Sequence, residues 1–151
     1  MAAQRRSNLN EEYWWFVQLL GAILLAMPVA WDRESKSRIM GLRTFPLVAL
    51  GACAYVIVGQ SFIGQGSTDA LARIMQGLLS GIGFVGGGAI IKHDDHVLGT
   101  ASAASIWVTG ALGAAVAFNE WGLAVALSAL NLGLVSLLGK LKSRVDREPS
   151  E

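Results

Sequence analysis

Charged residues are excluded from five stretches of this chain, and each stretch is about as long as a membrane-crossing helix. No Lys, Arg, Asp, Glu or His occurs in residues 13–31, 45–63, 74–91, 101–118 or 121–138. Each stretch has 18 or 19 residues, and a helix needs about 20 apolar residues to cross the hydrocarbon core. The stretches are apolar on all sides, whereas the strands of membrane β-barrels alternate apolar and polar residues. The sequence therefore predicts an all-α membrane protein, a bundle of about five transmembrane helices in the lipid bilayer.

The composition agrees with a single membrane domain. Only 15% of the 151 residues are charged, against roughly 25% in an ordinary soluble domain. The net charge of +1 gives no reason to expect a nucleic-acid partner. The single cysteine, Cys53, excludes an intramolecular disulfide. We expect a polar N-terminal tail over residues 1–12, a five-helix transmembrane domain over 13–138 and a charged cytoplasmic tail over 139–151.

The distribution of basic residues predicts the orientation of the bundle. If all five stretches cross, nine Lys and Arg residues lie on one side and three on the other. The positive-inside rule then places the N-terminus outside and the C-terminus in the cytoplasm. If 74–91 instead entered and left on the same side, the split would be eight against four. Five full crossings give the clearer asymmetry.

The stretch 74–91 is rich in glycine, which favours close helix packing. Gly77 with Gly81, and Gly83 with Gly87, form small-xxx-small pairs that let helix backbones approach each other. Because such a helix has little lateral bulk, we expect it at the centre of the bundle. The run GIGFVG within it formally matches the dinucleotide-binding fingerprint, but no strand precedes the run and no acidic residue lies about 20 positions after it.

The stretch 101–118 presents a second set of small residues, which makes it the natural partner for 74–91. These residues recur every four positions: Ala101, Ser105, Thr109, Gly113 and Ala117. Trp107 falls in the middle of the membrane, where its indole N–H needs a hydrogen-bond acceptor. Asn131 is the most central amide and is expected to mark a helix interface. The absence of ionisable residues from all five stretches argues against a proton relay or a carboxylate-lined cation path.

The charged loops offer the few residues that could bind a cation. A polar hairpin over 92–100 contains the run His-Asp-Asp-His, and the segment 32–44 lies on the same predicted side. Carboxylates suit magnesium and histidines suit zinc, although a solvated turn is the simpler interpretation. The candidates for metal ligands are Asp32, Glu34, Asp94 and Asp95.

The segment 32–44 is also the loop most favoured for function. It contains Arg33, Glu34 and Arg43. Arg43 could pair with Asp32, with Glu34 or with a lipid phosphate, or it could act only as a positive charge that sets the topology.

Three segments together resemble the MgtC/SapB family of bacterial membrane proteins. They are GLRTFPLVALG at 41–51, SGIGFVGGGAII at 80–91 and TASAASIWVTG at 100–110, and the pair Arg33-Glu34 precedes them. The resemblance implies a multi-pass protein of the bacterial inner membrane, associated with adaptation to low magnesium and with virulence. The best-known members look like regulators of membrane machinery, including the F-type ATP synthase. Longer members carry a soluble C-terminal domain, and we expect this chain to be the short form without it.

We therefore expect a regulator that contacts other membrane proteins, or further copies of itself, through its small-residue faces. The alternative is a small ion or magnesium transporter, or a channel-like oligomer, in which the run Gly86–Gly88 unwinds and offers carbonyl oxygens to a cation. We expect no enzyme, because the chain contains no credible catalytic set. The sequence identifies no cofactor.

Overall fold

A computed structural model describes residues 2–36, 40–63, 68–93 and 96–145 of the chain. Within these residues the chain forms five helices and one short hairpin: α1 (Ala2–Lys36), α2 (Thr44–Ile63), α3 (Thr68–Gly87), β1 (Ile91–His93), β2 (His96–Leu98), α4 (Thr100–Ala117) and α5 (Trp121–Val145). Each helix contains a segment that is long and apolar enough to cross a membrane. The predicted class, an all-α membrane protein with five spans, is confirmed.

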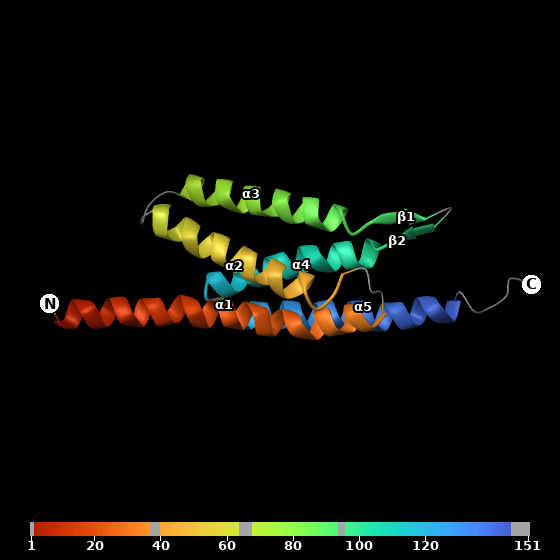
Figure 1. Cartoon of the computed structure of the whole chain (residues 1–151), viewed down its shortest axis with the longest axis horizontal. Helices are drawn as coiled ribbons and strands as arrows, with labels where there is room; N and C mark the ends of the chain where they lie inside the picture. The colour runs from red at the N-terminus through yellow and green to blue at the C-terminus, as the bar shows by residue number, and fades with distance from the viewer. Residues whose placement is uncertain (1, 37–39, 64–67, 94–95, 146–151) are drawn as a thin grey trace, which may run out of the picture.

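The five helices lie side by side along one common direction (Figure 1). Helices α1 and α5 form one side of the bundle, α3 forms the opposite side, and α2 and α4 lie between them. The start of α1 and the end of α5 lie at opposite ends of the bundle, as an odd number of crossings requires. The hairpin lies at the end of the bundle where α5 ends. Which end faces the cytoplasm stays a prediction.

The first and third helices differ from their expected bounds. The α1 helix begins at Ala2, so most of the segment expected as a polar tail continues the first span as helix. The α3 helix begins at Thr68 and ends at Gly87, and its last turn closes with a hydrogen bond from the Gly88 N–H to the Phe84 carbonyl (3.1 Å). The residues after it form β1, which pairs antiparallel with β2. The α3 helix extends through the length of the bundle without turning back.

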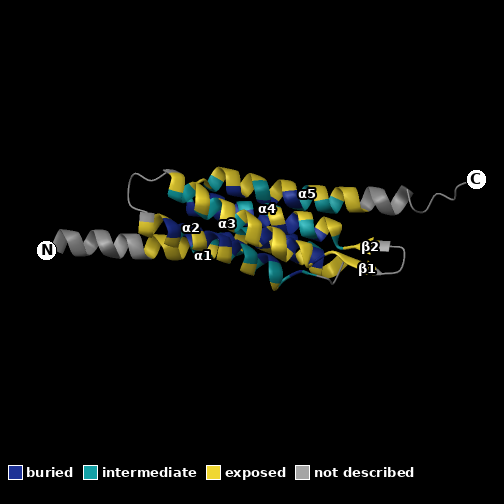
Figure 2. Cartoon of the chain, turned by 90° about the horizontal axis from the view of Figure 1, so that it is seen from above, coloured by how far each residue is buried: buried dark blue, intermediate teal, exposed yellow. Residues whose placement is uncertain are grey.

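The expectation that the glycine-rich stretch occupies the centre of the bundle is wrong, because that place belongs to α4. Inside the chain, 61% of the α4 span is buried, against 11% of the α3 span (Figure 2). The reason is steric. A Cβ atom at Gly113 of α4 would collide with the Ala49 carbonyl oxygen and lie 3.0 Å from the Ala49 carbonyl carbon, so α2 and α4 touch through their backbones. On α3, by contrast, the large side chains of Leu79 and Phe84 point outward.

Candidate functional site

A buried polar network joins α4 to α5. The Ser105 hydroxyl donates to the Asn131 Oδ1 atom (2.7 Å), and the Asn131 amide donates to the Ser105 carbonyl (3.3 Å). The Thr109 hydroxyl donates to the same carbonyl (2.8 Å). All three side chains are at most 4% exposed. Because these polar groups bond to one another, the network holds two helices together and presents no free group to a substrate.

A second polar cluster fastens the end of α1 to α5. The Asp32 carboxylate accepts hydrogen bonds from the Ser136 hydroxyl on α5 (2.7 Å), from the Arg33 guanidinium (2.9 Å) and from the Lys36 ammonium. The side chains of Asp32 and Arg33 are only 11% and 9% exposed. Asp32, a candidate metal ligand from the sequence, therefore has both carboxylate oxygens bonded within the chain.

Glu34 holds the segment that follows α1. Its Oε2 atom accepts a hydrogen bond from the Leu42 N–H (3.0 Å). Gly41 approaches so closely that a Cβ atom there would lie 2.8 Å from the Glu34 Cα atom, so only glycine fits this position. Arg43 follows with an exposed side chain and forms no ion pair within the part of the chain that the structure describes.

The structure brings together no metal site from the sequence candidates that it describes. Among the described residues, no group of three or more His, Cys, Asp or Glu side chains is placed to hold a metal ion. Asp94 and Asp95 lie outside the described residues.

The four α3 glycines expected in helix packing make no such contacts with the part of the chain that the structure describes. A Cβ atom at Gly77, Gly81, Gly83 or Gly87 would meet no other atom within 4 Å. Helical periodicity places the first two toward α2 and the last two on the side facing away from the bundle. We define the outer face of α3 by the small and polar residues on this side, all of them exposed, next to the exposed ring of Phe84: Ala72, Gln76, Ser80, Gly83 and Gly87.

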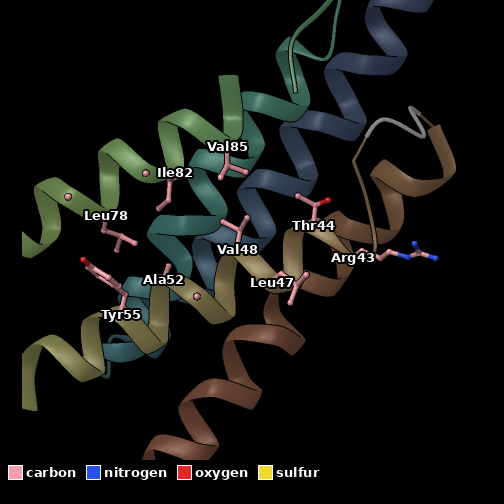
Figure 3. Close-up of a pocket in the computed structure, with 12 residues that line it drawn as sticks. Arg43, Thr44, Leu47, Val48, Ala52, Tyr55, Leu78, Ile82 and Val85 are labelled. Atoms are coloured by element: carbon pink, nitrogen blue, oxygen red, sulfur yellow. The ribbon is translucent and has the colours of Figure 1, made fainter. Parts of the chain in front are cut away.

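Between α2 and α3 lies a groove of about 670 Å³, shown in Figure 3. We call it the α2–α3 groove. Its walls are largely apolar, with Gly77 and Gly81 on the α3 side and Gly51 on the α2 side. Arg43 lies at one end, and Tyr55 lies at the other.

Trp107 lies apart from these features. Its side chain is 51% exposed on the outside of α4, and its indole N–H has no hydrogen-bond partner among the described residues. The small residues of α4 face its neighbours, which leaves this large ring on the lipid side.

Sequence reasoning did not single out Gln18, which is buried at the other end of the bundle. Its amide donates to the carbonyls of Val116 and Ala117, both at 3.1 Å, where α4 ends. Asn119 follows in the left-handed conformation (φ 62°) and accepts hydrogen bonds from Gln18 (3.1 Å) and from the Trp14 indole (2.8 Å). The one sequence signal was a polar amide inside an apolar span.

Comparison with known proteins identifies a family and several relatives that this chain is similar to. The model of the MgtC family matches residues 19–144. The protein MgtC of Salmonella typhimurium is 30% identical over 135 residues, which cover 89% of this chain and 57% of that protein. The protein SrpB of Synechococcus elongatus is 36% identical over 117 residues, covering 70% of this chain and 64% of SrpB.

The chain spans less than two thirds of the length of these relatives. No solved structure matches it. The matched residues include both polar clusters, the α2–α3 groove and the whole of α3. The resemblance noted in the sequence is thus confirmed, and the chain belongs to the MgtC family.

Proposed function

We propose that this membrane protein acts in the bacterial inner membrane as a regulator of other membrane machinery, in adaptation to low magnesium or host stress. It does so by binding a transmembrane helix of a partner on the outer face of α3. The observation that carries the proposal is that the residues defining this face are small or polar and exposed, and that nothing in the described chain would lie within 4 Å of a Cβ atom at Gly83 or Gly87.

The outer face of α3 is a poor surface for lipid and a good one for another helix. Gln76 and Ser80 are exposed there and make no hydrogen bond within the described residues. Polar groups left without partners in hydrocarbon are costly. Gly83 and Gly87 add no side chain, so a partner backbone can approach closely and accept or donate hydrogen bonds. A partner helix therefore gains both packing and polar contacts at this face.

The family resemblance supports the F-type ATP synthase as a candidate partner, and a second copy of this chain is the competing one. Both would bind the same face, since both would supply an apolar helix. No catalytic group is needed for such a role, so we propose a protein that acts by binding and not as an enzyme.

Site-directed crosslinking in native membranes tests the proposal. A photo-crosslinking amino acid at Ser80 is expected to capture a membrane protein that mass spectrometry can identify. The same amino acid at Leu130, an exposed residue of α5, is the control and is expected to capture much less. Equal capture at the two positions would remove the support for a specific face.

The alternative of a small magnesium or ion transporter rests on the run Gly86–Gly88. In the structure the Gly86 and Gly87 carbonyls accept hydrogen bonds from the N–H groups of Ala89 (3.0 Å) and Ile90 (3.1 Å), which occupies them locally. Flux measurements on the purified protein in proteoliposomes distinguish a transporter from a regulator. We expect no magnesium or proton flux above that of empty vesicles.

A further inference from the structure

The apolar and charged parts of the α2–α3 groove are arranged in a way that matches an anionic phospholipid. Its walls are lined by apolar side chains such as Leu47, Val48 and Ile82. Its one cationic residue, Arg43, lies at an end, beside the hydroxyl-bearing Thr44. A phospholipid likewise has an apolar chain and one charged end.

The charge at this end is not neutralised within the described chain. Of the two carboxylates that the sequence offered to Arg43, Asp32 bonds to Arg33, Lys36 and Ser136. Glu34 instead accepts the Leu42 N–H. The α2 helix begins at the groove with no acidic residue in its first turn, and the positive end of its dipole adds to the charge of Arg43. The end of the groove therefore favours an anion.

The length of the groove distinguishes a lipid chain from a helix. Along α2 its lining residues extend from Thr44 to Tyr55, which is about 17 Å at the helical rise per residue. This length is close to one leaflet, half of the roughly 30 Å of hydrocarbon, whereas a crossing helix would contact the full thickness. We infer that the α2–α3 groove binds one anionic phospholipid, with its phosphate at Arg43 and one acyl chain along the glycines. This site is separate from the outer face of α3.

Native mass spectrometry of the full chain in mild detergent tests the inference, with palmitoyl-oleoyl phosphatidylglycerol or phosphatidylcholine added. Arg43→Gln is expected to weaken phosphatidylglycerol binding about fivefold, the effect of removing one basic residue near a lipid surface, and to change phosphatidylcholine binding little. The matched control is Arg73→Gln, an exposed arginine outside the groove. Equal effects of the two substitutions would overturn the inference.

A second pair of variants tests the acyl chain. Gly81→Leu is expected to fill the groove and weaken binding of both lipids, while Gly122→Leu on α5, which also has open space around it, is expected to change neither. Gly51→Leu fills the groove from the opposite wall and replaces Gly81→Leu if that variant does not fold. Unchanged lipid binding with a smaller dimer fraction would overturn the inference and assign the groove to a second copy. Displacement of phosphatidylglycerol by inorganic phosphate alone would overturn the acyl-chain site.

Discussion

A single amide, Gln18, holds three parts of the fold together at one end of the bundle. The last carbonyls of a helix have no partner within it, and Gln18 of α1 donates to two of them at the end of α4. Gln18→Leu keeps the approximate size but removes the donor, so we expect it to lower the free energy of unfolding by about 1–2 kcal/mol. Equilibrium unfolding in mixed detergent micelles measures this loss.

The control for that measurement is Gln60→Leu. Gln60 is an exposed amide of α2 with no hydrogen bond among the described residues, so its loss should leave the stability almost unchanged. A similar loss for both variants would show that Gln18 contributes no more than any amide in a span.

Among the helices, α4 is the element on which the others pack, and its contact with α2 is the tightest. Gly113→Ala introduces a Cβ atom against the Ala49 backbone, and overpacking of this kind costs about 1–3 kcal/mol. We expect a lower yield of folded protein, measured by size-exclusion chromatography in detergent. Gly81→Ala on α3 meets open space and should fold like the wild type; the reverse order of the two yields would contradict the central position of α4.

For the helices, the local signals in the sequence were sufficient to predict that each one exists, but not always where it lies. The absence of charged residues identified all five spans, because this signal depends only on the lipid that surrounds each span and not on how the helices pack. Asn131 indicated an interface for a similar reason, since an amide in lipid needs a partner. The glycine pairs of α3 indicate that something packs against them, but not whether that partner belongs to the same chain. Gln18 contacts residues far away in the sequence, and no local pattern reveals such a pairing.

For the whole molecule, the testable property is its orientation in the membrane. The end of the bundle where α5 ends is also where α1 ends, α2 begins and the hairpin lies, so it carries Arg33, Lys36, Arg43 and Lys92, and basic loops remain in the cytoplasm. A green fluorescent protein fused after Glu151 should therefore fluoresce, whereas alkaline phosphatase at the same position should be inactive. An active phosphatase would reverse the orientation.

The hydrogen bonds that side chains make between helices are distributed unevenly in the bundle, and this has a mechanical consequence. Hydrogen bonds between side chains, or from side chains to backbone, link α1, α4 and α5 to one another, but within the described residues none reaches α2 or α3 from another helix. Displacement of α3 across its neighbours therefore disrupts only dispersion contacts and the order of nearby lipid, whereas separating α1, α4 and α5 would also break hydrogen bonds. A force applied to α3 would therefore displace this helix more easily than it would separate α1, α4 and α5.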